Sequence, residues 1–136
     1  LAKYIIMNDI INSDFIDNAT EGFDTFSRSI QKLSWKEIET SSGLKREEIE
    51  MIGGYYARSK NTIFSWCMGI THHPHGTATV QQIVNLALIR GMVGKKHAGL
   101  LPIRGHSSVQ GIGSMGVTPK LKKDIFDQLD FKAFKR

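Results

Sequence analysis

Apolar residues recur at helical spacing along the first part of the chain. The clearest stripe has gaps of three, four and three positions and consists of Phe23, Phe26, Ile30 and Leu33. This spacing places the four side chains on one face of an amphipathic helix. Similar patterns predict helices over residues 1–11 and 45–59. We therefore expect a helical lead-in over residues 1–60.

Local signals predict where one of these helices begins and ends. Ser34 and Glu37 have the spacing of a capping box, in which each side chain bonds the backbone of the other residue. The box predicts a helix that begins at Trp35. Gly43 predicts its end, because glycine readily adopts the left-handed conformation that follows a helix.

Three further residues affect the helices expected over residues 1–60. Ser13 is the expected cap of a short helix over residues 14–18. Gly53 and Gly54 interrupt the helix over 45–59, and each costs about 1 kcal/mol relative to alanine. We expect this pair to let another part of the backbone approach closely.

The middle of the chain changes to a strand-like pattern. Residues 62–68 are rich in β-branched and aromatic types and are apolar on both faces, which predicts a central parallel strand. A histidine-rich loop follows over 70–76, and an almost wholly apolar segment follows over 80–93. We expect that segment to be a helix buried on most sides. Thr77 or Thr79 would cap it.

Glycines and lysines dominate the last third of the chain. The glycine-rich segment 99–118 is predicted to be an irregular loop, and residues 119–131 to be a basic terminal helix. The strand, histidine loop and buried helix together occupy 61–95. We therefore expect residues 1–136 to form a single partial domain of the α/β class, mostly helical and with few strands.

Composition limits the domain size, the compartment and the class of partner that we expect. A chain of 136 residues is long enough for one domain with a core. Its one cysteine excludes an internal disulfide framework and fits a reducing compartment, so we expect a cytoplasmic protein. No apolar run reaches the roughly 18 residues of a membrane span, so no membrane partner is expected. The net charge of +5 favours an anionic partner. Because the chain starts at Leu1 within a helical pattern, we expect it to be a piece of a longer polypeptide.

The histidines suggest a metal site. His72, His73 and His75 are spaced so that two imidazoles could converge on zinc, and His106 follows farther along the chain. Against this reading, Pro74 stiffens the turn, no carboxylate is near in sequence, and the spacing matches no established zinc pattern. We predict no metal ligand here, and a zinc hydrolase built on this loop is kept as an alternative.

Two other chemistries fit less well. Cys67 lies in an apolar strand, where a thiolate is disfavoured, so it would be a poor nucleophile. The terminal lysines lack the interleaved aromatic residues on which bases stack, so nucleic acid is not the expected partner. A basic helical module that binds acidic partners or nucleic acid is the main alternative function.

A ligand site made largely of backbone groups fits the middle of the chain better. Residues 68–72 turn off the carboxyl end of the predicted strand, where glycine permits close approach and N–H groups are free. Arg104 lies between Pro102 and Gly105 in a constrained loop, a setting that suits a bidentate grip on an anion. The alternative for Arg104 is a surface arginine that braces its loop.

Three ordered motifs resemble the molybdopterin oxidoreductase family, in its formate dehydrogenase alpha-subunit-like branch. They are Trp-Cys-Met-Gly-Ile-Thr-His-His at 66–73, the apolar stretch at 83–94 and the glycine-rich stretch at 99–111. The resemblance covers nearly the whole chain. It implies a mostly helical fragment of a Rossmann-like molybdopterin-binding domain with few strands.

The resemblance also implies a cofactor, bis-molybdopterin guanine dinucleotide with molybdenum. The family's Met-Gly-x-Thr-Gln stretch, which contacts the pterin, falls on residues 68–72. The expected cofactor contacts are therefore Met68, Gly69, Ile70, Thr71 and His72. His72 stands where the family more often has glutamine.

The last motif implies a catalytic site. The formate dehydrogenases' Arg-Gly-Gln-Asn-Asn-Val-Gln-Gly reads here as Arg-Gly-His-Ser-Ser-Val-Gln-Gly over 104–111. Arg104 then holds a small anionic substrate beside the metal, His106 takes the place of the neighbouring glutamine, and Gly105 contacts the cofactor. The catalytic residues expected are Arg104 and His106.

Other parts of the family are not within these 136 residues. There is no cysteine cluster and no cysteine placed to ligate molybdenum. An iron–sulfur cluster, where the parent protein has one, would lie elsewhere in it. We expect this fragment to be inactive alone and to work with the remaining domains of the parent.

Overall fold

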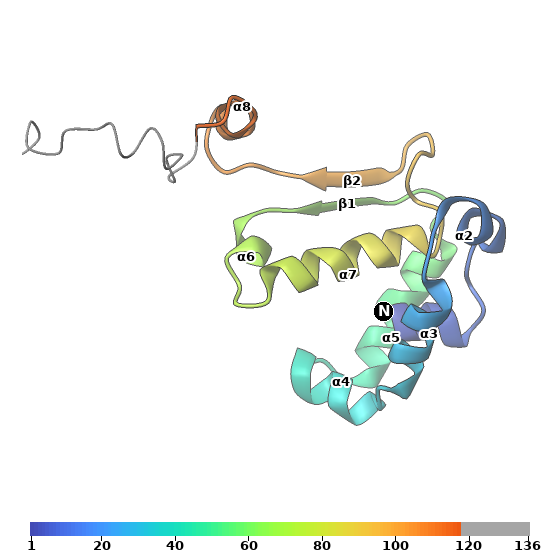
Figure 1. Ribbon diagram of the computed structural model, residues 1–136. Coiled ribbons are helices and arrows are strands. Elements are labelled where there is room, and N and C mark those ends of the chain that lie inside the picture. The colour runs from blue at the N-terminus through green and yellow to red at the C-terminus, as the bar shows by residue number, and fades with distance from the viewer. Residues whose placement is uncertain (118–136) are drawn as a thin grey trace, which may run out of the picture. The chain divides into compact units, whose positions relative to one another are not determined.

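The computed structural model describes residues 1–117 (Figure 1). The chain divides into two compact units, Leu1–Ile103 and Arg104–Arg136, and each is described by itself. The break falls inside the segment 99–118, which the sequence pattern assigns to one loop. The expected basic helix over 119–131 lies outside the described residues.

Five helices form the first part of unit one, as the apolar spacing predicts. They are α1 (Ala2–Met7), α2 (Ser13–Ala19), α3 (Phe23–Lys32), α4 (Trp35–Ser42) and α5 (Arg46–Arg58). The first helix is shorter than expected. It ends at Met7, and Asp9 then turns the chain with a positive φ of 53°.

The capping box of α4 is confirmed. The Ser34 hydroxyl accepts the N–H of Glu37 at 3.2 Å, and the Glu37 carboxylate accepts the N–H of Ser34 at 2.7 Å. Gly43 ends the helix in the left-handed conformation, with a φ of 72°. This helix is thus fixed by residues within one turn of its ends.

The predicted cap of α2 is wrong by one residue. Ser13 is already the first helical residue, and Asn12 before it is extended. The Asn12 Oδ1 atom accepts the N–H of Phe15 at 3.0 Å. Asparagine caps helices at least as well as serine, so the neighbouring position competes successfully.

Helices α1 and α5 pack together at Gly53, but the group next to this glycine is a side chain and not the backbone that we expected there. A Cβ atom at Gly53 would lie 2.5 Å from the Tyr4 ring.

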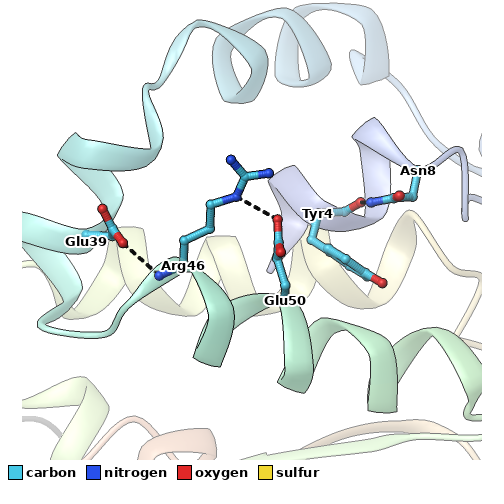
Figure 2. A network of polar contacts seen from close by, with 5 residues as sticks. All are labelled: Tyr4, Asn8, Glu39, Arg46 and Glu50. Atoms are coloured by element: carbon cyan, nitrogen blue, oxygen red, sulfur yellow. Dashed lines mark hydrogen bonds and ion pairs between the residues drawn. The ribbon is translucent and has the colours of Figure 1, made fainter.

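Polar contacts organise the start of α5 (Figure 2). The Glu39 carboxylate accepts the N–H of Arg46 at 2.7 Å, and Arg46 Nε donates to Glu50 at 2.7 Å.

The sheet of unit one has two parallel strands, β1 (Ile63–Trp66) and β2 (Gly99–Pro102). The first confirms a parallel strand within the predicted range 62–68, but it is shorter, and the expected burial on both faces is wrong because Ile63 and Ser65 are exposed. The second corrects the expectation of irregular chain from residue 99 onward. Its four residues begin with glycine and end with proline, both strand breakers, and only pairing with β1 makes the segment extended.

Helix α7 (Gly76–Leu88) runs along one face of this strand pair (Figure 1). It differs from the prediction in three ways. It begins earlier, with His75 before it and no side-chain cap from Thr77 or Thr79; it ends at Leu88 instead of Val93; and only Gly76 and Ala87 in it are buried. Two strands cover a single face of the helix, so its other apolar side chains stay partly open.

The core joins the lead-in helices to α7 and the segment that follows it. Its buried members are Ile5, Tyr56, Ala87, Ile89 and Met92. Phe64 of β1 and Leu100 of β2 pack against this cluster from the sheet. The opposite face of the sheet exposes Ile63 and Leu101.

Unit two contributes one described helix, α8 (Val109–Ser114). It too corrects the expectation of an irregular loop. Glycines at 111 and 113 weaken a helical prediction, because each lowers helix propensity.

Candidate functional site

The residues expected to contact a pterin lie at the carboxyl end of β1. They form a one-turn helix, α6 (Met68–Thr71), and not the open loop that the sequence suggested. The Cys67 carbonyl accepts the N–H groups of Ile70 and Thr71 at 3.1 and 3.3 Å, and the His72 N–H donates to Met68 at 2.9 Å. The expectation that N–H groups of this turn are free is therefore wrong for Ile70, Thr71 and His72.

Two backbone donors at the start of α6 are available. Within residues 1–117, the N–H groups of Met68 and Gly69 have no hydrogen-bond partner, as is usual in the first turn of a helix. Nothing lies within 4 Å of the position that a Cβ of Gly69 would take. A ligand can therefore approach this part of the backbone closely.

The turn from α6 into α7 is closed by short-range bonds. The Gly76 N–H donates to the His73 carbonyl at 2.8 Å, and the His75 N–H donates to His73 Nδ1 at 3.3 Å. We call residues 67–76 the α6–α7 corner. Its shape is set by its own backbone, and most of its side chains, including those of Met68, Thr71 and His72, are exposed.

The second predicted loop leaves the sheet at the same edge. Because β1 and β2 are parallel, both carboxyl ends lie together. The Ile103 N–H donates to the Trp66 carbonyl at 2.8 Å, so the chain leaves β2 beside the point where α6 begins. This edge is where ligands bind in open α/β sheets.

Arg104, Gly105 and His106 begin unit two and are exposed. No described residue forms an ion pair with Arg104. These residues and the corner belong to different units, so their convergence on one ligand stays a prediction.

The histidines do not gather into a metal site within the described part of the chain. Among residues 1–117, no three side chains of His, Cys, Asp or Glu are placed to hold a metal ion. The rings of His73 and His75 are 5.8 Å apart between centroids and tilted by 48°. In the same residues, no helix is long and apolar enough to cross a membrane.

Sequence reasoning missed the residues that hold α7 in place. Arg90, just beyond α7, donates to the carbonyls of Ala57 and Ser59 at 2.8 Å each, at the end of α5. Its guanidinium carbon lies 5.2 Å from the Tyr56 ring centre. These contacts join segments more than thirty residues apart, and no local pattern could have revealed them.

Tyr56 adds further contacts between α5 and α7. We call Arg90 and Tyr56 together the α5–α7 clamp. Its hydroxyl donates to the Leu86 carbonyl at 2.8 Å, and its ring meets Phe64 of β1 edge to face at 5.5 Å. Burial raises the pKa of the Tyr56 hydroxyl, and the nearby Arg90 charge opposes this only in part. The phenol therefore stays a neutral donor, and it fixes the end of α7 against α5.

An open cleft of about 920 Å³ lies beside this clamp. Its walls come from the segments around residues 9–14, 57–61 and 90–95. Four cationic residues line it, and two of them are engaged: Arg90 bonds the end of α5, and Lys95 Nζ donates to the Lys60 carbonyl. Asp9 and Asp14 add opposite charge. This mixture indicates no particular ligand.

Known proteins resemble this chain along most of its length. Protein YdeP of Escherichia coli is 42% identical over 120 residues, which are 88% of the chain and 16% of the relative. An uncharacterised oxidoreductase of Mycobacterium tuberculosis is 32% identical over 129 residues, 95% of the chain and 17% of the relative. Formate dehydrogenase H of Escherichia coli is 33% identical over 119 residues, 88% of the chain and 17% of the relative.

The chain spans about a sixth of the length of the curated relatives it matches. No protein-family model matches it. The similarity to an oxidoreductase and to a formate dehydrogenase supports the resemblance to molybdopterin oxidoreductases that the motifs suggested, although it does not select a branch.

Proposed function

We propose that this chain is a segment of a molybdenum-dependent oxidoreductase of the formate dehydrogenase-like type. In this proposal it is part of a Rossmann-like domain that binds bis-molybdopterin guanine dinucleotide and a small anionic substrate. The remaining domains of the parent complete the enzyme, so the segment alone is inactive. The similarity to two relatives, an uncharacterised oxidoreductase and formate dehydrogenase H, supports this proposal. We assign the parent to the cytoplasm, which the single cysteine favours.

One observation carries the proposal. Both candidate loops leave the sheet at the shared carboxyl edge of two parallel strands, where Ile103 bonds Trp66. The corner follows one strand directly, and Arg104 is the next residue after Ile103. Two segments distant in sequence thus start from neighbouring points at the edge that binds ligands in such sheets.

The chemistry of the corner suits a pterin. A pterin ring and its phosphates carry acceptor oxygens and nitrogens, and Met68 and Gly69 offer N–H donors without partners among the described residues. Gly69 has room for close approach, and the Thr71 and His72 side chains are exposed donors. The Ile70 side chain is partly buried and its N–H bonds the Cys67 carbonyl, so Ile70 would contribute through the shape of the turn.

The proposed division of labour follows from these positions. When bound, the molybdenum cofactor supplies the electron transfer, as cofactors generally supply the demanding chemistry. The corner orients it through N–H donors. Arg104 holds the anionic substrate by charge, and its planar guanidinium fixes the orientation of a carboxylate. Gly105 allows the chain to pass close to the cofactor, and His106 donates a hydrogen bond next to Arg104.

The test uses Arg104 in the full-length parent. We expect Arg104→Ala to lower kcat/KM by about 10–100-fold, because it removes charge-assisted hydrogen bonds to the substrate. Molybdenum and pterin content should not change. Arg104→Lys keeps the charge and should recover only part of the loss, since lysine cannot form the bidentate contact.

Arg28→Ala is the matched control. Arg28 is an exposed arginine on α3 whose Nε bonds a backbone carbonyl in its own helix, so its loss should leave kcat/KM unchanged. Wild-type kcat/KM in Arg104→Ala would remove Arg104 from the mechanism and reject the proposed substrate site.

A further inference from the structure

Gly76, the first residue of α7, has no room for a side chain. A Cβ atom there would lie 2.6 Å from the Thr71 carbonyl oxygen and 3.0 Å from that of Ile70. The φ of Gly76 is not positive, so the requirement is for space and not for a special conformation. Both opposing atoms belong to the backbone of α6, and a backbone cannot swing aside as a flexible side chain does.

We propose that Gly76 is a positioning residue for the pterin-contacting turn at 68–72, an inference that rests on the proposed function. Its missing side chain lets α7 press against the carbonyl groups of α6. That contact fixes the direction of the peptide planes in the turn. Gly76 itself touches neither cofactor nor substrate in this account.

The α6 side of the contact cannot retreat without losing hydrogen bonds. The Thr71 carbonyl shares its peptide plane with the His72 N–H, which donates to Met68 at 2.9 Å. The Ile70 carbonyl shares its plane with the Thr71 N–H, which donates to Cys67 at 3.3 Å. With a methyl group at 76, the distance from its carbon to the Thr71 oxygen would have to grow from 2.6 Å to ordinary contact at 3.4 Å. That movement would rotate or shift these planes.

The α7 side is equally fixed. The Gly76 N–H donates to the His73 carbonyl at 2.8 Å. Farther along the same helix, Ala87 is 0% exposed in the core, and the Leu86 carbonyl accepts from Tyr56. Helix α7 therefore cannot slide away from α6 without disturbing the core, and a side chain at 76 must displace the turn.

Displacement of the turn would misdirect its two free donors. The N–H groups of Met68 and Gly69 lie at the start of α6, one turn or less from the displaced carbonyls. A misplacement of about 1 Å in groups that position a reactant can cost on the order of 100-fold in rate. A methyl group at 76 would thus affect cofactor binding without touching the cofactor.

The experiment places Gly76→Ala in the full-length parent and compares it with Gly113→Ala. Gly113 is also helical but has nothing within 4 Å of its Cβ position. Hydrogen exchange by mass spectrometry should show the Thr71 and His72 amides of Gly76→Ala exchanging about tenfold faster or more. Pterin content and kcat/KM should fall together. Gly113→Ala should leave the exchange of those amides unchanged.

Several results would overturn the inference. Unchanged exchange at Thr71 and His72, with normal pterin content, removes Gly76 from the positioning of the turn. Faster exchange spread evenly over α5, α7 and β1 shows a general structural role instead. A wild-type parent without pterin rejects the proposed function itself, whatever the exchange data show.

A second measurement applies if Gly76→Ala does not fold. In a structure of the cofactor-bound wild-type parent, the Thr71 carbonyl should still lie against Gly76, with the Met68 and Gly69 N–H groups facing the pterin. A Thr71 carbonyl turned away from Gly76 in that structure would contradict the proposal.

Discussion

Gly53 in α5 and Gly76 at the start of α7 both lack room for a Cβ atom, but for different reasons. A Cβ atom at Gly53 would lie 2.5 Å from the ring of Tyr4, whereas a Cβ atom at Gly76 would lie 2.6 Å from a backbone oxygen. In the first region, side chains of separate helices define the packing. In the second, the backbone defines its own shape.

This difference separates stability from binding. Around α5, buried side chains such as Ile49 and Tyr56 contribute to the core, and their loss should destabilise the fold. In the α6–α7 corner, the backbone holds the geometry, so exposed side chains such as Thr71 and His72 are not needed for packing. Such a region can present groups to a ligand at little cost to the fold.

The largest expected effect on stability comes from removing Arg90 of the α5–α7 clamp. Arg90→Ala removes two hydrogen bonds to the carbonyls of Ala57 and Ser59 and the contact with the Tyr56 ring. We expect the free energy of unfolding of the chain to fall by about 3 kcal/mol in urea titrations. The matched corner variant, His72→Ala, should change it by less than about 0.5 kcal/mol. Equal losses in the two variants would show that the corner contributes as much to stability as the α5 region does.

The next effect uses the glycine pair of α5. Gly53→Ala should destabilise the chain by roughly 1–3 kcal/mol, because the methyl group meets the Tyr4 ring. Gly54→Ala should be neutral or stabilise by up to about 1 kcal/mol, because its nearest neighbour is the flexible end of Arg58 at 3.3 Å and alanine favours helix. Thermal unfolding of both variants measures the difference. The reverse order would show that α1 and α5 pack differently.

A smaller effect is expected at Tyr56. Tyr56→Phe keeps the ring packing against Phe64 but leaves the Leu86 carbonyl without the hydroxyl donor. The loss should be about 1 kcal/mol in the free energy of unfolding. It should speed amide exchange near the end of α7 more than in the corner. Faster exchange confined to the corner would mean that the two regions are coupled differently.

The smallest effect concerns pH and the cap of α4. The Ser34 hydroxyl, and then its backbone N–H, lower the pKa of Glu37 below its ordinary value of 4.5. A group whose pKa is lower in the folded state stabilises the fold above its ordinary pKa and loses this contribution as the pH falls through the lowered value.

Glu37→Gln should therefore flatten the acid part of the stability curve while leaving the corner unaffected. Helical circular dichroism measured from neutral to acid pH compares the variant with wild type. Curves of the same slope for the two proteins would exclude a role of Glu37 in acid stability.

The parts of the fold that depend on neighbours in sequence could be predicted. The stripe from Phe23 to Leu33 and the box of Ser34 and Glu37 both act within a few turns, so their residues carry the information themselves. The four-residue strand β2 could not be predicted, because Gly99 and Pro102 disfavour a strand and only the distant partner β1 selects it.

The candidate site, too, could be predicted only in part. Its position at the end of β1 follows from the pattern of residues 62–72, but the one-turn helix α6 within it does not. Cys67 accepts two N–H groups that an open loop would leave free, and nothing in the residue types announces this. The roles of Gly76 and Arg90 depend on contacts between segments that meet only in the folded chain.

The most direct test measures metal and pterin in the purified full-length parent. We expect near-stoichiometric molybdenum together with extractable molybdopterin guanine dinucleotide, and a fall in pterin when the corner is altered by Gly76→Ala. A correctly folded parent that contains neither molybdenum nor pterin would reject the proposed function.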